Sequence, residues 1–122
     1  MLPRVIIVDD DLAVRMSLRA LFESHDIGVQ EFSSGRPFLE EFEDDNSSVL
    51  ILDMHLPDLD GRQILQELRL GRNLGLPIVM ITGRAEPGMS EDLLSRGANR
   101  FLKKPFDGDQ LVEIAKQLHI SR

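Results

Sequence analysis

The fold is decided by two stretches of sequence, RVIIVDDD at residues 4–11 and VLILDMHLPDLDG at residues 49–61. Each contains an apolar run of Val, Ile or Leu that is followed directly by aspartate. A near-continuous apolar run of this length is typical of a strand that is covered on both faces, as in a parallel sheet. The two stretches therefore predict two buried strands, at residues 4–8 and 49–52, each followed by aspartate.

Three further runs, at residues 28–32, 78–82 and 100–103, complete a set of five predicted strands. The run at 28–32 is more polar than the others, which is typical of an edge strand. Amphipathic, helix-like patterns separate the runs. Strands and helices that alternate at this spacing predict right-handed crossovers, and hence a doubly wound α/β sheet of parallel strands with helices on both faces.

Residues that commonly cap helices stand beside three of the helical patterns. Asp11 and Asp107 precede the first and the last pattern, where a carboxylate can accept hydrogen bonds from free backbone N–H groups. Gly97 follows the fourth pattern, where glycine commonly closes a helix. These residues support the predicted helix ends and give Asp11 a structural role.

The composition is that of one globular domain. The chain has 122 residues, 42% of them hydrophobic, and a net charge of −7 from 21 acidic and 14 basic residues. A net negative charge argues against direct binding of this domain to the phosphate backbone of a nucleic acid, so DNA would be bound only through another domain. The apolar runs are too short to span a bilayer, so no membrane contact is expected. The absence of cysteine excludes disulfides and thiolate metal sites, and favours a cytoplasmic location.

Polar groups follow four of the five predicted strands, at the edge where doubly wound sheets bind ligands. Each group has an ordinary explanation alone, because aspartate commonly caps a helix there, threonine forms turns and lysine is solvated. Together they include clustered carboxylates, which repel one another unless a cation compensates them. The groups are Asp9-Asp10-Asp11, Asp53, Thr82-Gly83 and Lys103-Lys104-Pro105.

These residue types suit the transfer of a phosphoryl group to a carboxylate. Carboxylate oxygens at one rim make a Mg²⁺ site that keeps several waters, which a phosphate can replace. A carboxylate can act as the nucleophile and form an aspartyl phosphate. A lysine ammonium then neutralises the phosphoryl oxygens, and a threonine hydroxyl adds a hydrogen bond. The sequence thus predicts a phosphate-accepting site at this edge of the sheet.

The chain resembles the receiver domain of the response regulators of bacterial two-component systems, over essentially its whole length. The resemblance implies the CheY-like, flavodoxin-like fold with strand order 2-1-3-4-5. It also implies a signalling phosphoacceptor that assists its own phosphotransfer and dephosphorylation, and not a turnover enzyme. The motifs that carry the likeness follow in the family's order and spacing: Val5–Asp10, Leu50–Gly61, Ile81-Thr82-Gly83 and Lys104-Pro105-Phe106.

The resemblance implies a role for each residue of the predicted site. Asp53 is implied to be the phosphorylated residue, and Lys104 and Thr82 to contact the phosphoryl group. The implied ligands of Mg²⁺ (or Mn²⁺) are Asp9, Asp10, Asp53 and the backbone carbonyl of His55. The His55 side chain is expected to face solvent.

Other residues are implied to shape the site or to transmit its state. Thr82 and Phe101 match the family's switch pair, although the family commonly has Tyr where this chain has Phe101. A signal that depends on the tyrosine hydroxyl is therefore not available to this chain. Pro57 and Gly61 are expected to shape the loop after the third strand. The family often makes the bond before Pro105 cis.

The implied partners are a sensor histidine kinase and a second copy of the chain. Phosphorylation is expected to promote a homodimer through the fourth helix, the fifth strand and the fifth helix, at residues 86–97, 100–103 and 107–119. Residues 81–83 resemble receivers of the FixJ type, which precede a DNA-binding domain. Because Met1 opens the receiver, we expect residues 1–122 to be one receiver domain and any output domain to lie beyond residue 122. A single-domain regulator that acts by protein contact is the alternative.

Two readings from other classes compete with a phosphorylated receiver. A haloacid-dehalogenase-like phosphatase would explain Asp9-Asp10-Asp11 as its nucleophile motif, but it leaves Asp53 without a role. It also needs a second acidic pair after Lys104, where Asp107 and Asp109 instead open a helix. A receiver fold that only binds partners would commonly lack the acid pair, the acceptor or the lysine, all of which are present here.

Overall fold

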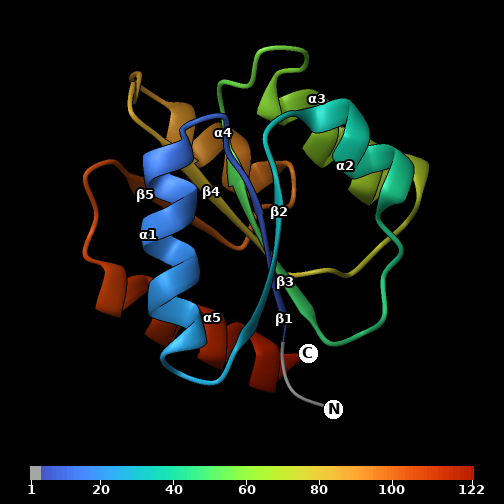
Figure 1. The fold of residues 1–122 in the computed structure, drawn as a ribbon. Coiled ribbons are helices and arrows are strands. Elements are labelled where there is room, and N and C mark those ends of the chain that lie inside the picture. Colours follow the sequence, from blue (N-terminus) through green and yellow to red (C-terminus); the bar gives the residue numbers. More distant parts are fainter. Residues whose placement is uncertain (1–3) are drawn as a thin grey trace.

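In the computed structural model, which describes residues 4–122, five parallel strands alternate with helices (Figure 1). The expected opening of the domain at Met1 lies outside these residues. The strands are β1 (Arg4–Val8), β2 (Gly28–Phe32), β3 (Ser48–Asp53), β4 (Ile78–Thr82) and β5 (Arg100–Lys103). The helices are α1 (Leu12–Glu23), α2 (Gly35–Glu41), α3 (Gly61–Gln66), the π-helical segment η1 (Glu67–Gly71), α4 (Met89–Ser95) and α5 (Gly108–Ser121).

The strand order is β2-β1-β3-β4-β5, which confirms the predicted doubly wound sheet. From β1 the chain crosses to β2 on one side, and from β2 it crosses back past β1 to β3 on the other. The strand order therefore reverses between β1 and β3, whose residues pair in parallel from Arg4 with Ser48 to Val8 with Leu52. The carboxyl ends of these two strands form the switch point at which such sheets bind ligands.

Alternate residues of the central strands point into two apolar cores. One face of the sheet packs against α1 and α5, and the other packs against α2, α3 and α4 (Figure 1). Ile6 and Leu50 belong to the second core, whereas Ile7 and Ile51 belong to the first, as the two-residue period of a strand requires. Because both faces are covered, β1, β3 and β4 read as apolar runs in the sequence.

The predicted caps are confirmed. The Asp11 carboxylate accepts hydrogen bonds from the N–H groups of Ala13 and Val14 at the start of α1, and Asp107 accepts one from Asp109 at the start of α5. Gly97 follows α4 with φ at +108°, a left-handed conformation that favours glycine. Asp11 is thus occupied as a helix cap.

Two helices differ from their sequence patterns. The fourth was expected from residue 86, but α4 begins at Met89 because Gly88 has φ at +80° and cannot continue a helix backwards. The apolar pattern after Gly61 predicts an ordinary helix that stops near Gly71, but Glu67–Gly71 form the π-helical η1 instead. Arg69 of η1 donates to the Gly97 carbonyl beyond α4, and Arg72 donates to the Leu39 carbonyl near the end of α2.

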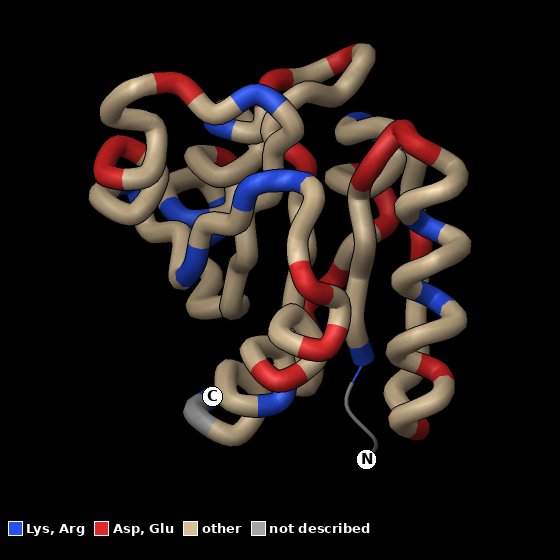
Figure 2. Tube along the Cα trace, turned by 90° about the vertical axis from the view of Figure 1, so that its left-hand side faces the viewer, with Lys and Arg blue, Asp and Glu red and all other residues tan. Residues whose placement is uncertain are grey.

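Charged residues are distributed unevenly around the sheet. On the side that carries α1, β5 and α5, acidic stretches of α5 lie close to basic stretches of β5 (Figure 2). None of the helices in the described part of the chain is both long enough and apolar enough to cross a membrane.

Candidate functional site

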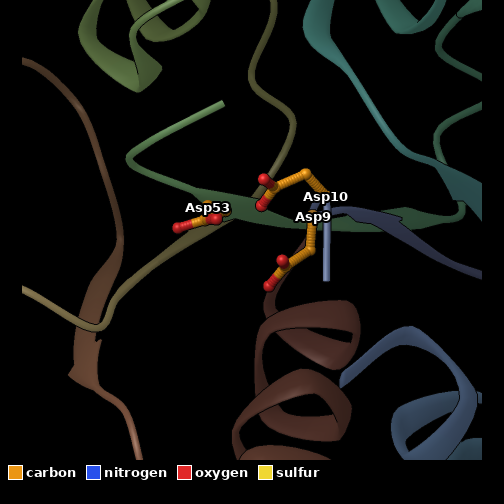
Figure 3. A group of neighbouring side chains, drawn as sticks. All are labelled: Asp9, Asp10 and Asp53. Carbon is orange, nitrogen blue, oxygen red and sulfur yellow. The ribbon is translucent and has the colours of Figure 1, made fainter. Parts of the chain in front are cut away.

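Three carboxylates meet at the carboxyl ends of β1 and β3. Asp9 and Asp10 follow β1, Asp53 ends β3, and the three side chains lie side by side (Figure 3). One carboxylate oxygen of each lies within 4.8 Å of the others. Asp9 and Asp53 are buried, with 0% and 4% of their surface exposed, whereas Asp10 is exposed. The topology therefore brings together the acids that the sequence placed at two separate strand ends.

Lys104 supplies the positive charge of the site from the end of β5. Its Nζ lies 2.8 Å from Asp9 Oδ2 and 3.7 Å from Asp53 Oδ2. Its backbone N–H donates a 2.7 Å hydrogen bond to the Thr82 carbonyl, and its bond to Pro105 is cis, as expected. Burial alone would lower the pKa of the Lys104 ammonium, but its contacts with Asp9 and Asp53 outweigh burial and raise it. Lys104 is thus a fixed cation at neutral pH.

Asp53 is held in an environment that resists its ionisation. Burial raises the pKa of its carboxyl to about 6, and the negative charges of Asp9 and Asp10 add to the rise. The Lys104 ammonium and the His55 N–H, which donates to Asp53 Oδ1 at 3.4 Å, act in the opposite direction. The cluster therefore has more negative charge than the protein itself compensates.

The donor set fits Mg²⁺. Asp9 Oδ2 is buried and accepts no well-directed hydrogen bond from the described residues, although Lys104 Nζ is close. Hard carboxylate oxygens are the ligands that Mg²⁺ prefers, and the exposed Asp10 leaves room for bound water. Among the described residues, Asp9, Asp10 and Asp53 are the acids grouped closely enough to hold a metal ion.

The His55 side chain differs from its expectation. We expected it to face solvent, but the residue is half-buried and its Nε2 is enclosed without a hydrogen-bond partner among the described residues. The backbone of His55 pairs with that of Asp60, which folds the loop back on itself.

The loop between β3 and α3 is fixed by close packing and by a cap. A Cβ on Gly61 would lie 2.9 Å from Met80 Cε and 3.2 Å from the Asp53 carbonyl, so only glycine lets α3 begin this close to the acceptor strand. Pro57 is exposed at the outer part of the loop.

The Asp58 carboxylate accepts hydrogen bonds of 2.8 and 2.7 Å from the N–H groups of Gly35 and Arg36, and so caps α2. Sequence reasoning missed this contact because no local pattern links a loop residue to a helix that precedes it by 22 residues or more.

Thr82 and Phe101 lie on the α2–α4 side of the sheet. Thr82 is fully buried, and its Oγ1 accepts a 3.0 Å hydrogen bond from the Arg84 N–H. Phe101 of β5 pairs with Met80 of β4. Met80 and Thr82 are two residues apart on β4, so the side chains of Thr82 and Phe101 lie on the same face of the sheet. Phe101 is half-buried and packs against the core on that face.

Comparisons with known proteins agree with this architecture. The sequence model of the response regulator receiver domain matches residues 5–116. Nodulation protein W of Bradyrhizobium diazoefficiens is 39% identical over 110 residues, which are 89% of this chain and 48% of that protein. Transcriptional regulatory protein FixJ of the same organism is 31% identical over 108 residues, which are 88% of this chain and 52% of FixJ.

Solved structures agree as well. The response regulator StyR superposes with a TM-score of 0.87 and 34% identity, over 100% of this chain and 63% of StyR. The chain spans about half the length of Nodulation protein W and FixJ. The phosphatase alternative gains no support, because Asp107 caps α5. With the family match, the strand order and the acidic site in agreement, the chain belongs to the response regulator receiver domain family.

Proposed function

We propose that this chain is a phosphorylation-controlled switch that accepts a phosphoryl group on Asp53, with Mg²⁺ held beside it. The observation that carries the proposal is the position of the Asp53 carboxylate, which lies close to an acidic pair and to a lysine at the switch point of the sheet. A carboxylate with a pKa of about 6 is mostly ionised at neutral pH, and is more basic than an ordinary aspartate. Asp53 is thus suited to act as a nucleophile.

Each residue of the site has a part in this transfer. An Asp53 oxygen forms a bond to phosphorus while the bond from phosphorus to the donor breaks, and the donor leaves with the electron pair. Lys104 neutralises charge on the transferred oxygens, and the Thr82 hydroxyl offers a hydrogen bond. Asp9, Asp10, Asp53 and the His55 carbonyl are the proposed metal ligands. When bound, Mg²⁺ neutralises the phosphoryl oxygens and orients them.

Incubation with acetyl phosphate and Mg²⁺ should add the mass of one phosphoryl group to each chain, and a chelator should prevent the addition. The expected limit of one group follows because Asp53 is the single proposed acceptor, and the need for Mg²⁺ follows from the uncompensated acids. Intact-mass spectrometry measures the stoichiometry, and an assay for released phosphate measures turnover. Rapid catalytic release would support a phosphatase instead, and an unlabelled but folded chain would support a receiver that only binds partners.

We propose that Thr82 and Phe101 transmit the phosphorylated state. A phosphoryl group on Asp53 would draw the Thr82 hydroxyl away from the Arg84 N–H, and the space that it leaves favours an inward Phe101 ring. A shift of the population from 1:99 to 99:1 needs about 5.5 kcal/mol of differential binding. A few polar contacts supply less than that, so a partial shift is expected.

The proposed partners are a histidine kinase and an output domain. A groove of about 480 Å³ lies between α1 and the loop after β5, beside the site, and Asp11, Val14 and Lys104 are among its lining residues. The exposed Leu12 and Met16 on α1 add apolar surface that a kinase could cover. The lengths of the relatives, and the naming of FixJ as a transcriptional regulatory protein, support a DNA-binding output domain beyond residue 122. A single-domain regulator is the alternative, and for either we propose a cytoplasmic location.

Phosphorylation is proposed to promote a homodimer through α4, β5 and α5. A two-fold dimer pairs one patch with itself and so needs both charge signs on it, which this side provides (Figure 2). Arg96 already pairs with Asp92 inside the chain. Leu94 of α4 is 44% exposed and gives the patch an apolar centre. Further charges on this patch include those of Glu91, Arg100, Lys103, Asp107 and Asp109.

Loading the domain with beryllofluoride and Mg²⁺ is expected to convert monomers to dimers in sedimentation at high micromolar concentration, and added salt should weaken the dimer. Thr82→Ala is the matched variant, which should still load but should dimerise less. A parent domain that stays monomeric in low salt, with the site demonstrably loaded, would rule this dimer out for the isolated domain.

A further inference from the structure

Arg15 reaches from α1 to the backbone of the acidic pair. It lies one helical turn after Asp11, and its side chain is 14% exposed. Its Nη1 donates a 2.7 Å hydrogen bond to the Asp9 carbonyl, and its Nε donates a 3.1 Å hydrogen bond to Glu31 Oε1 in the edge strand β2. The guanidinium thus connects α1, β2 and the peptide that joins Asp9 to Asp10.

The Asp9 carbonyl lies just beyond the end of β1. The Asp9 N–H still donates to the Phe32 carbonyl at 3.1 Å, and Asp9 Oδ1 accepts a 2.9 Å hydrogen bond from the Asp11 N–H. Arg15 holds the carbonyl, so the backbone of Asp9 is fixed on both sides. The Asp9 carbonyl and the Asp10 N–H belong to one planar peptide. Fixing that plane also fixes the direction in which the Asp10 side chain leaves the backbone.

We propose that Arg15 is a positioning residue for metal binding, which holds the Asp9–Asp10 peptide so that both carboxylates face one divalent cation. The inference rests on the proposed metal site. A guanidinium suits the role because its N–H groups form a rigid fork, and the bond to Glu31 sets the angle of the fork. Residues that orient ligands without touching the metal commonly change metal affinity by about 10- to 100-fold.

Charge and positioning predict opposite effects when Arg15 is replaced. Loss of a cation beside the acids strengthens their attraction for Mg²⁺, whereas a loosened peptide weakens Mg²⁺ binding. Arg19 provides a matched control, because it carries the same charge on the same helix and also pairs with Glu31. Its other ion pair is with Glu23, and it does not contact Asp9.

The test is a Mg²⁺ titration of the full chain without any phosphodonor, followed by backbone amide shifts in NMR. Arg15→Gln is expected to weaken Mg²⁺ binding about 10-fold. Arg19→Gln is expected to bind as the parent does, or slightly more tightly. The amide resonances of Asp10 and Asp11 should move in metal-free Arg15→Gln and stay in place in Arg19→Gln. Arg15→Lys keeps the charge without the fork, and is expected to weaken binding as well.

Two results would overturn the inference: parent-like affinity in Arg15→Gln, or equal weakening in Arg15→Gln and Arg19→Gln. If Arg15→Gln does not fold, Glu31→Gln takes its place. This variant leaves Arg15 present but removes the charge that anchors its fork, and it should weaken Mg²⁺ binding by less than the effect expected for Arg15→Gln. Parent-like affinity in Glu31→Gln would then contradict the proposal.

Asp10→Ala separates this inference from the function on which it rests. If Asp10→Ala binds Mg²⁺ normally, the metal site itself is wrong. If Asp10→Ala loses Mg²⁺ while Arg15→Gln keeps it, only the role of Arg15 is wrong.

Discussion

Asp53→Asn is expected to reduce phosphorylation by acetyl phosphate from one group per chain to none. The substitution keeps the size and shape of the side chain but replaces the nucleophilic oxygen with an amide, whose nitrogen lone pair is delocalised. Asp53 is buried at the end of the central strand, with Lys104 and the acidic pair beside it. Intact-mass spectrometry after incubation with Mg²⁺ and acetyl phosphate measures the result.

Asp26→Asn is the matched control for this experiment. Asp26 lies in the turn between α1 and β2, at the edge of the sheet opposite the site, and has φ at +60°. Asparagine tolerates this left-handed conformation as readily as aspartate does, so the same substitution should leave the fold and the phosphorylation intact. Full labelling of Asp53→Asn would instead move the acceptor to another acid, with the exposed Asp10 as the first to test.

The sheet could be predicted from the sequence because its strands are apolar on both faces. Four of the five strands have the predicted bounds, and β3 is longer than predicted by one residue at each end. The ends of β3 are Ser48 and Asp53, two polar residues that the apolar run could not include. They join the strand because neighbouring strands pair with them, Asp53 with Ile81 and Ser48 with Arg4. Strand ends thus depend on partners that a local pattern does not contain.

The π-helical end of α3 could not be predicted for a similar reason. The apolar pattern through Leu68 fits an ordinary helix, and no residue marks the change at Glu67. In the fold, Arg69 reaches towards α4 and Arg72 towards α2, and η1 orients both. Only the tertiary arrangement of α2, α3 and α4 gives that conformation its contacts.

The composition of the site was predictable, but its pairings were not. Parallel topology alone requires Asp9, Asp10 and Asp53 to meet, because the carboxyl ends of β1 and β3 are neighbours. Lys104 Nζ lies nearest to Asp9 Oδ2, a contact that residue types do not indicate, and its contact with the phosphoryl group stays a prediction. The contacts of Arg15 and Asp58 involve backbone groups on other elements, so residue types give no signal for them. These contacts depend on the three-dimensional packing of the loops around the sheet.

Asp53→Asn is also expected to stabilise the metal-free protein increasingly as pH rises from roughly 4.5 to 7.5. Burial, with the charges of Asp9 and Asp10, raises the pKa of Asp53 to about 6 in the folded chain, against an ordinary value of 3.8. The folded state thus binds this proton more tightly than the unfolded state does. The free energy of unfolding of the parent therefore falls as pH rises through this window, by about 2 kcal/mol of the roughly 3 kcal/mol that the whole shift in pKa represents. Asparagine has no such proton, so the variant should not share the fall.

Urea unfolding with a chelator present, followed by circular dichroism because the chain has no Trp or Tyr, measures the difference between parent and variant at each pH. Asp45→Asn is the control with a different pH window. Burial alone would raise the pKa of Asp45, but hydrogen bonds from Ser47 and Ser48 and the charge of Arg4 lower it to about 2. The Asp45 carboxylate contributes its full stabilisation at pH values above its ordinary pKa. The difference in unfolding free energy for Asp45→Asn should therefore stay constant over the range in which that for Asp53→Asn grows.

Bound Mg²⁺ should shrink the advantage of Asp53→Asn, because the cation compensates the carboxylate in the parent. A difference for Asp53→Asn that does not change with pH would mean that burial and the charges of Asp9 and Asp10 do not raise the pKa of Asp53.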